Sequence, residues 1–452
     1  MLKCDKIKLT TFVIVIFLLA CCFNSHLMHL GTLPMQKKIT VGESLDLGFE
    51  KTNKLLAALQ VDVIDSNNTI KYSLTRTAPV VTTPGKIDMS LKLFGLIPLR
   101  QVTIDVIQQT KVIPGGHSVG ILLHANGVLI VGMSAVEDTD GNQFNPAKEA
   151  GIKVGDVLLK INGTPVKTEY QVRDIVIQAG QDKKPIVLDL ERQGEKITTE
   201  IKPIYNKNTK IYALGLLIRD SAAGVGTLTF YDPETKAYGA LGHVITDVDT
   251  GKKINMSNGR LIGAEIKEIH PGQKGLPGEK VGVLETNNSM SGTIERNTYH
   301  GIFGSLSHPI KNPFFQKPIP VAVSNQIKEG PAEIITVLQG NKMEKFKVEI
   351  EKVSRQLQPE GKGVIIKITD PRLLSVTGGI IQGMSGSPII QYYNGQPILV
   401  GAVTHVFIND PTRGYGVLAE WMVQQAQRVP KKSKDKLPKH DVSTRYSTQN
   451  AA

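Results

Sequence analysis

Cysteine is missing from almost the whole chain. The 452 residues contain three cysteines, Cys4, Cys21 and Cys22, and all of them lie near the N-terminus. Disulfide bonds and cysteine-ligated metal sites are therefore excluded from the rest of the chain. Aromatic residues are also few, at 5% of the sequence, whereas glycine is abundant with 43 residues. This composition favours a mainly β protein with many short strands and turns over a helical bundle.

The sequence also lacks the usual signatures of nucleic-acid, nucleotide and metal binding. The formal net charge is +12, but the basic residues form no compact stripe interleaved with aromatic residues, so we expect no nucleic-acid partner. An anionic membrane or cell-wall surface fits this charge better. No Walker-type phosphate loop, complete dinucleotide-binding motif or metal-spaced cluster occurs in the sequence, so we expect no cofactor and no metal.

The N-terminal segment, residues 1–34, has the pattern of an export signal. Lysines at positions 3, 6 and 8 precede a largely apolar run from Leu9 to Phe23, which is the order found in a signal peptide or membrane anchor. The run is shorter than the roughly 20 apolar residues of a spanning helix, although residues 27–33 would extend it. Residues 18–21, Leu-Leu-Ala-Cys, also resemble a lipoprotein cleavage site. We therefore expect export and contact with a membrane, and we leave cleavage, retention and lipidation open.

The chain is too long for one hydrophobic core, so two or three domains are expected. Residues 35–100 alternate apolar and polar positions and predict a small β-rich region. The pattern over residues 101–205 changes to strands separated by two helices. Residues 206–425 are again rich in short strands broken by turn residues, which is typical of sandwiches and barrels. Residues 426–452 are rich in lysine without apolar periodicity and predict a disordered tail.

Part of the second region resembles a PDZ domain. Residues 145–152, Asn-Pro-Ala-Lys-Glu-Ala-Gly-Ile, precede residues 154–163, Val-Gly-Asp-Val-Leu-Leu-Lys-Ile-Asn-Gly. This is the PDZ order of helix, turn, strand and hairpin. The Gly-Asp and Asn-Gly pairs form turns because glycine tolerates positive φ and Asn or Asp can bond the adjacent backbone. The resemblance predicts a PDZ domain over residues 101–205.

PDZ domains bind an extended peptide beside one strand and hold its carboxylate with the backbone amides of the preceding loop. The residues that stand in the position of this loop are Ser118, Val119, Gly120 and Ile121. Residues 169–178 would form the helix on the other side of the groove. The resemblance therefore implies a peptide ligand, bound in cis or in trans. The alternative is a rigid spacer with an empty groove.

The strongest chemical signal is the segment of residues 383–388, Gly-Met-Ser-Gly-Ser-Pro. An apolar strand enters a glycine-rich turn, presents Ser385, and leaves as a second apolar strand. This exposure suits a hydroxyl nucleophile, and the backbone amides of Gly383 and Ser385 would form an oxyanion hole, as in chymotrypsin-like proteases. The nucleophile elbow of an α/β hydrolase requires glycine at the position of Ser387 and a helix after the turn. The sequence has serine at this position and a predicted strand after the turn, so it does not match an elbow. A structural turn rich in small residues is the remaining alternative.

A serine nucleophile needs a base, and His243 is the best candidate. It follows a predicted hairpin, residues 224–230 and 237–246, whose second strand delivers the histidine. In chymotrypsin-like proteases the histidine likewise comes from the first barrel and the serine from the second. His405, on the strand after the nucleophile, is the rival candidate, and it is predicted to be a strand residue that lines the substrate cleft. The sequence thus predicts two barrels over residues 206–425.

The acid that would orient the histidine cannot be chosen from spacing. The carboxylates that follow His243 at an eligible distance are Asp247, Asp249, Glu265 and Glu268. None of them lies in a decisive motif.

Taken together, these motifs resemble the stage IV sporulation protein B peptidases of endospore-forming bacteria. The resemblance rests on the PDZ segment, on Gly242-His243, on residues 368–372 (Ile-Thr-Asp-Pro-Arg) and on the turn of residues 383–388. It implies a serine peptidase whose triad is His243, Asp370 and Ser385. From the residues alone, Asp370 is equally well explained as the cap of a turn before proline.

The resemblance also implies a biological task. Such a protein is exported across the inner forespore membrane, cleaves a membrane-tethered regulator, and so frees an intramembrane protease to process the late mother-cell sigma factor. Self-cleavage near the N-terminus and control by the PDZ domain belong to the same expectation. A different class of function, a non-catalytic PDZ adaptor at the membrane surface, is the alternative, but it has no physical need for His243 and the serine turn together.

Overall fold

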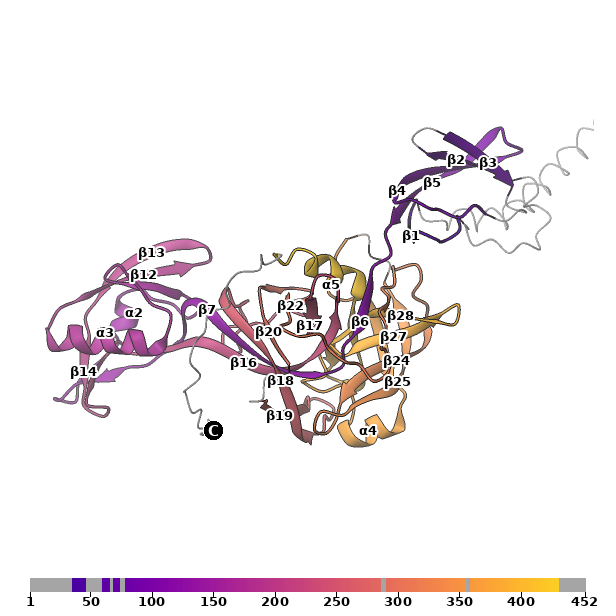
Figure 1. The fold of residues 1–452 in the computed structure, drawn as a ribbon. Coiled ribbons are helices and arrows are strands. Elements are labelled where there is room, and N and C mark those ends of the chain that lie inside the picture. The colour runs from indigo at the N-terminus through magenta and orange to yellow at the C-terminus, as the bar shows by residue number, and fades with distance from the viewer. Residues whose placement is uncertain are drawn as a thin grey trace, which may run out of the picture.

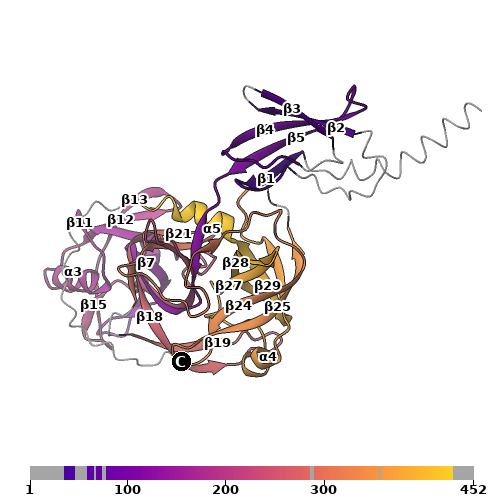
Figure 2. The same ribbon diagram turned by 45° about the vertical axis from the view of Figure 1, so that its right-hand side comes forward.

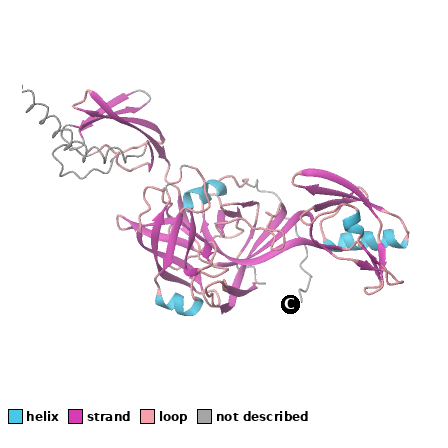
Figure 3. Ribbon diagram, turned by 180° about the vertical axis from the view of Figure 1, so that it is seen from behind, coloured by secondary structure: helices cyan, strands magenta, loops and turns pink. Residues whose placement is uncertain are grey.

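The computed structural model describes residues 35–45, 59–65, 68–73, 78–285, 290–354, 356 and 358–430. A small N-terminal sheet lies at one end of the molecule and a domain with the predicted PDZ elements at the other end (Figure 1). Between them lies the region that the sequence predicts to be a peptidase, called the peptidase region below. Strands dominate all three (Figure 3), as the composition predicts. The predicted signal or anchor and most of the predicted tail lie outside the described residues. Within these ranges, no helix has both the length and the apolar character needed to cross a membrane.

The N-terminal sheet has five strands in the order β1-β5-β4-β2-β3. They are β1 (Gln36–Thr40), β2 (Leu59–Asp65), β3 (Asn68–Ser73), β4 (Gly85–Leu93) and β5 (Ile97–Ile107). The predicted alternation is present in β4, where Ile87, Met89 and Leu91 are buried in one core. β5 crosses the predicted boundary at residues 100 and 101 because it pairs with β4 along its whole length.

The PDZ domain packs a sheet against one long helix. Its elements are β8 (Val136–Glu137), β9 (Gln143–Phe144), α2 (Pro146–Glu149), β10 (Val157–Ile161), β11 (Thr164–Pro165), α3 (Glu169–Gln181), β12 (Ile186–Arg192), β13 (Glu195–Ile201), β14 (Ile204–Asn206) and β15 (Ile211–Ala213). α3 begins with a capping box between Thr168 and Gln171. One face of the helix, with Val172 and Val176, then joins the domain core. The helix, turn, strand and hairpin predicted from the sequence are confirmed.

Two 16-residue strands connect the PDZ domain to the peptidase region (Figure 1): β7 (Ser118–Met133) and β16 (Leu216–Tyr231). They pair antiparallel, from Leu216 opposite Met133 to Thr227 opposite Ser118. β10 pairs with β7 inside the PDZ domain, and β18 pairs with β7 inside the peptidase region. The PDZ domain is therefore inserted between two paired strands of the peptidase region, which differs from the predicted order of one domain after the other.

The first half of the peptidase region surrounds the near ends of β7 and β16. Its other strands are β6 (Lys111–Pro114), β17 (Ala237–Ala240), β18 (Met256–His270), β19 (Glu279–Leu284), β20 (Ser291–Thr293), β21 (Arg296–Thr298), β22 (Gly301–Ser305) and β23 (Ile319–Pro320). All of them belong to one 14-stranded sheet that also includes the PDZ strands β10 to β13. The hairpin predicted before His243 is present, because β16 pairs with β17.

The second half is a closed barrel in the order β24-β25-β26-β29-β28-β27 (Figure 2). Its strands are β24 (Gly330–Val337), β25 (Met343–Val353), β26 (Val364–Ile368), β27 (Pro388–Tyr393), β28 (Gln396–Phe407) and β29 (Asp410–Leu418). Helix α4 (Pro371–Thr377) follows β26, and helix α5 (Ala419–Ala426) follows β29. The barrel interior is filled with aliphatic side chains such as Ile334, Ile366 and Val400.

Candidate active site

Ser385 lies in the turn between α4 and β27. Two glycines flank it, Gly383 with φ +88° and Gly386 with φ +94°, and both adopt the left-handed conformation that glycine tolerates. A Cβ atom on Gly386 would also lie 2.0 Å from the carbonyl oxygen of Thr227 on the neighbouring strand. The turn can therefore pass this close to β16 only with glycine on that side of the serine.

The turn leaves two backbone N–H groups without an acceptor among the described residues, those of Gly383 and Ser385. The other amides around the serine all donate hydrogen bonds within the structure, and they belong to Gln382, Met384, Gly386 and Ser387. An oxyanion hole needs two donors of this kind that are free to bind a developing negative charge. These are the two amides that the sequence analysis names for the oxyanion hole, and their binding of an oxyanion stays a prediction.

His243 follows the last residue of β17 by a short turn. Leu241 (φ +67°) and Gly242 (φ +75°) both have positive φ values, and a Cβ atom on Gly242 would lie 2.8 Å from Thr404 Cγ2. The tight turn thus places His243 next to β28 of the closed barrel. The imidazole Nδ1 lies 2.8 Å from the carbonyl oxygen of Val244. Burial lowers the pKa of His243 below its usual 6.5, and the contact with Val244 opposes this shift.

The structure brings Ser385 and His243 to the same strand, β28. Ser385 Oγ donates to the carbonyl oxygen of Thr404 at 2.8 Å, and the ring of His405 lies 5.0 Å from the ring of His243, at an interplanar angle of 45°. Partial burial, followed by the charges of His243 and Lys362, lowers the pKa of His405 to about 4. His405 is therefore neutral at pH 7 and packs against the candidate base.

Asp370 is held in a different role. It is the N-cap of α4, and its carboxylate accepts the N–H groups of Arg372 at 3.0 Å and Leu373 at 3.1 Å. It also accepts the N–H of Lys347 at 3.3 Å. Neither oxygen receives a hydrogen bond from His243, so the structure does not join Asp370 to the other two residues. This is the capping role that the sequence left open beside the catalytic one.

The four other candidate acids are also paired elsewhere. Asp247 and Asp249 bind Arg219 at 2.9 and 2.8 Å. Glu265 pairs with Lys267, and Glu268 lies 3.5 Å from His270. The carboxylate partner of His243 therefore stays a prediction. Among the described residues, no group of three His, Cys, Asp or Glu side chains is arranged to hold a metal ion.

Residues 118–121 do not form the carboxylate-binding loop that the sequence predicts there. Ser118, Val119, Gly120 and Ile121 are buried at the peptidase end of β7. β16 pairs with them on one side and β18 on the other, so their backbone is already occupied. β7 then continues as one strand into the PDZ domain.

The strand beside α3 comes instead from the far end of β16. Leu216 pairs with Met133, and Ile218 pairs with Ile130. The Asp220 carboxylate accepts the N–H of Glu169, the first residue of α3, at 3.2 Å. Over the described residues, no strand pairs with the other edge of β16 from 216 to 225. This open edge lies where the sequence placed residues 118–121.

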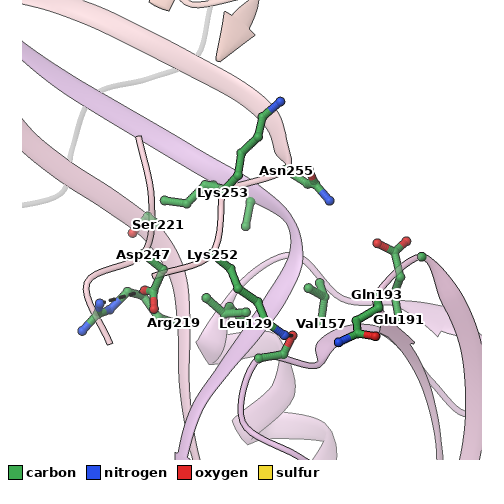
Figure 4. Close-up of a pocket in the computed structure, with 14 residues that line it drawn as sticks. Leu129, Val157, Glu191, Gln193, Arg219, Ser221, Asp247, Lys252, Lys253 and Asn255 are labelled. Carbon is green, nitrogen blue, oxygen red and sulfur yellow. Dashed lines mark hydrogen bonds and ion pairs between the residues drawn. The ribbon is translucent and has the colours of Figure 1, made fainter. Parts of the chain in front are cut away.

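A cavity of about 330 Å³ lies where the PDZ domain meets the peptidase region (Figure 4). Its lining residues come from both sides, with Val157 and Glu191 from the PDZ strands and Asp247 and Lys252 from the loop after His243. Lys252 Nζ donates to the carbonyl oxygen of Gly155 at 3.2 Å and so ties this loop to the PDZ domain. The base-bearing loop is therefore in direct contact with the inserted domain.

Comparison with known families agrees with this geometry. Residues 210–423 match the family described as SpoIVB peptidase S55. Residues 137–190 match a PDZ domain. The chain therefore carries an S55 serine peptidase domain and a PDZ domain. The match to the S55 family begins between β14 and β15, so it includes the whole of β16 but omits β6 and β7 of the peptidase fold.

Individual relatives are more distant. The putative serine protease HhoA of Synechocystis is 30% identical over 112 residues, which cover 25% of this chain and 26% of that protein. The chain thus spans about a quarter of the length of that relative. The Rv3671c protease of M. tuberculosis in its active form has a TM-score of 0.27 and 16% identity, over 48% of this chain and 78% of that one. The PDZ domain of an SdrC-like protein from Listeria monocytogenes has a TM-score of 0.17 and 16% identity, over 21% and 87%.

The sequence analysis did not identify the residues that pack against the serine turn of the candidate site. Thr227, Thr404 and Lys280 all contact the serine turn or its hydrogen-bonding partner. A signal for Thr227 was available, because two threonines alternate with apolar residues on the strand predicted over residues 224–230. A polar residue at such a position needs a specific partner.

Proposed function

We propose that this protein is an exported serine endopeptidase that cleaves a membrane-tethered protein regulator during sporulation. One observation carries the proposal. Ser385 and His243 contact neighbouring residues of β28, and the two free amides belong to the turn that holds Ser385. The S55 family match supports the same chemistry. The membrane and sporulation parts follow from the resemblance and from the N-terminal sequence pattern.

The proposed reaction proceeds in steps that involve the serine turn and His243. The Ser385 hydroxyl attacks the scissile carbonyl carbon and passes its proton to the neutral imidazole of His243. The carbonyl oxygen becomes an oxyanion, which the N–H groups of Gly383 and Ser385 bind. The imidazolium then gives its proton to the leaving amine, and water hydrolyses the acyl-enzyme by the same steps. The first step needs the Ser385 hydroxyl to leave its hydrogen bond with Thr404, because that hydrogen must pass to His243.

An active-site probe tests the chemistry directly. A fluorophosphonate should label the full-length parent protein on Ser385, and Ser385→Ala should abolish both this labelling and any self-cleavage. His243→Ala should slow the labelling by several powers of ten, because the serine loses its base. Parental labelling or self-cleavage by Ser385→Ala protein would refute the peptidase assignment, and thermal unfolding of each variant controls for loss of fold.

The biological role needs a separate test. The source organism carrying Ser385→Ala on its chromosome should form far fewer heat-resistant spores than the parent strain. The strain carrying an exposed-surface change such as Lys196→Met should sporulate normally, since Lys196 lies on the outer PDZ strand β13. Normal spore counts with a fully unreactive enzyme would separate the peptidase from sporulation without affecting the chemical assignment.

The proposed role of the PDZ domain is to bind an extended peptide at the open edge of β16, opposite α3. Backbone pairing at an exposed strand edge is how PDZ domains take their ligands. Half-buried Ile175 on α3 faces the core that Leu216 and Ile218 also contact. Ile175→Arg should weaken binding of peptides with free C-termini, measured by fluorescence anisotropy, and Val187→Arg, at an exposed position of β12, should not. Equal binding by both variants would place the ligand elsewhere.

A further inference from the structure

Two buried threonines on β16, Thr227 and Thr229, contact the turn that carries Ser385. Both side chains are 0% exposed, and neither takes part in the proposed reaction. A hydroxyl buried this deeply destabilises a protein unless it has a hydrogen-bonding partner. The partners of these two hydroxyls therefore indicate why threonine occupies the positions.

Both hydroxyls bind the glycines that flank the nucleophile. Thr227 Oγ1 donates to the carbonyl oxygen of Gly383 at 2.8 Å, and Thr229 Oγ1 donates to that of Gly386 at 2.8 Å. The backbone N–H of Thr227 also donates to the carbonyl oxygen of Ser385 at 2.9 Å. One strand thus holds carbonyl groups before, at and after the nucleophile.

These bonds fix the peptide groups that adjoin the two free amides of the turn. A peptide group is planar, so a bond that holds its carbonyl oxygen also fixes the N–H of the next residue. Thr227 in this way fixes the peptide between Gly383 and Met384. The N–H of Ser387 donates to the carbonyl oxygen of Met384 at 2.9 Å and so fixes the peptide that contains the Ser385 amide.

The remaining peptide of the oxyanion hole is fixed from the first half of the peptidase region. The N–H of Lys280 on β19 donates to the carbonyl oxygen of Gln382 at 3.0 Å, which fixes the peptide that contains the Gly383 amide. The side-chain stem of Lys280 also packs against Gly383, with its Cβ 3.0 Å from where a Cβ on that glycine would stand. Every carbonyl of the turn is thus held.

We propose that Thr227 and Thr229 are positioning residues of the peptidase, which hold the carbonyl groups on both sides of Ser385 and so keep the Gly383 and Ser385 amides available to the oxyanion. The inference rests on the proposed function, since it has a meaning only if Ser385 is the nucleophile. Neither threonine contacts the substrate. Their effect on the reaction passes entirely through the backbone of the turn.

The same strand continues into the PDZ domain. β16 carries Thr227 and Thr229 near one end, and Leu216 at its other end pairs with the PDZ part of β7. No loop interrupts the strand between these points. A displacement of β16 at the PDZ end would therefore reach the two carbonyl-binding hydroxyls through the strand itself.

Matched substitutions at both positions test the proposal in the full-length protein. Valine has nearly the shape of threonine without the hydroxyl, and serine keeps the hydroxyl with less bulk, so Thr227→Val, Thr227→Ser, Thr229→Val and Thr229→Ser form two pairs. The control is Thr199→Val, because Thr199 Oγ1 makes a similar bond to the carbonyl oxygen of Ala150 at 2.9 Å within the PDZ domain. The measurement is the second-order rate of labelling by a fluorophosphonate from pH 4.5 to 8.5. In that reaction Ser385 Oγ bonds to phosphorus, fluoride leaves, and His243 takes the hydroxyl proton.

Thr227→Val should label about 10- to 100-fold more slowly than the parent, since misplaced oxyanion donors cost on this order. Thr227→Ser should return to within about threefold of the parental rate, a rescue that depends on the hydroxyl. The pH midpoint of labelling should stay at the parental value, because His243 is unchanged. Thr199→Val should match the parent at every pH.

Three outcomes would decide against the proposal. Parental labelling rates in folded Thr227→Val and Thr229→Val proteins would show that the hydroxyls do not position the turn, although the peptidase would stand. If Thr227→Val does not fold, the pair at position 229 carries the test; if neither valine variant folds, the hydroxyls serve stability and the proposal is withdrawn. An unlabelled parent would instead remove the proposed function on which the inference depends.

Discussion

Ser385 donates its hydroxyl hydrogen to the carbonyl oxygen of Thr404 at 2.8 Å instead of to His243. The imidazole Nδ1 likewise lies beside the carbonyl oxygen of Val244. Nucleophile and base thus lie against consecutive residues of β28, Thr404 and His405, without the hydrogen bond needed for proton transfer. In proteases without substrate this bond is often long or poorly aligned and forms only in the complex.

The base should work at a lower pH than an ordinary histidine. Burial lowers the pKa of His243 below 6.5, and only the neutral imidazole can accept the Ser385 proton. The rate of fluorophosphonate labelling should therefore rise with pH through a midpoint below 6.5 and stay level above it. His124→Asn, at an exposed position on β7, is the matched control and should leave the midpoint unchanged. A midpoint above 6.5 would contradict the lowered pKa of His243.

His405 should act through its ring and not through its charge. The two imidazoles pack with centroids 5.0 Å apart, and His405, with its pKa lowered to about 4, is neutral over the working range. His405→Phe should keep labelling within about threefold of the parent, because a ring of similar size still packs there. His405→Ala should slow it by up to about tenfold, the value of an aromatic pair. An equally large loss in His405→Phe would require a polar role for this residue.

Asp370 can be tested as a cap and as an acid with the same variants. Loss of an N-cap carboxylate costs about 0.5 to 2 kcal/mol, so Asp370→Ala should lower the free energy of unfolding by this amount, whereas Asp370→Asn and Asp370→Ser should largely preserve it. Chemical denaturation measures this effect. Labelling of folded Asp370→Asn then assigns the second role: a parental rate leaves Asp370 outside the triad, and a loss near 10⁴-fold makes it the orienting acid.

Lys280 should make the stability of the protein depend on pH. Its amino group is buried with Thr336 Oγ1 as partner at 2.6 Å, and burial lowers the pKa of Lys280 to about 7 from 10.5. Between these values the unfolded chain binds more protons than the folded one, so stability should rise with pH. From pH 7.5 to 9.5 the parent should gain about 2 kcal/mol relative to Lys280→Met, measured by urea denaturation. Lys196→Met, at an exposed position of β13, should follow the parent. If the free energy of unfolding depended on pH equally in all three proteins, burial would not lower the pKa of Lys280.

The local features of this protein could be predicted from its sequence because each depends on neighbouring residues. The glycine-rich turn around Ser385 and the hairpin before His243 are set by positive φ values and by short-range pairing. The same is true of the capping alternative for Asp370, which needs only the next three residues. For residues that meet across the two halves, the sequence marks Thr227 as a polar residue among apolar ones, but nothing near it in the chain identifies Gly383 as its partner.

The wrong position predicted for the carboxylate-binding loop shows the limit of prediction from short sequence patterns. Asn126-Gly127 is the dipeptide most typical of a two-residue hairpin, and a hairpin there would have placed residues 118–121 beside α3. In the structure β7 continues through it as one strand, with Gly127 at φ +112° and a shift in the register with β16 between His124 and Leu129. β16 pairs with this strand at both of its ends, so a continuous strand forms more backbone bonds than a hairpin would. Long-range pairing of this kind cannot be read from one segment.

The insertion of the PDZ domain between two paired strands makes the domain removable in principle. At the junction, His124 on β7 lies directly opposite Ser221 on β16, and the chain leaves and returns at that single point. A two-residue hairpin joining these positions would close the peptidase fold without the domain. A shortening of β16 by one residue would instead turn Thr227 and Thr229 to the opposite face of the strand, because side chains alternate along it. The length of β16 between Ser221 and Thr227, where the pairing with β7 has no register shift, is therefore fixed in steps of two residues.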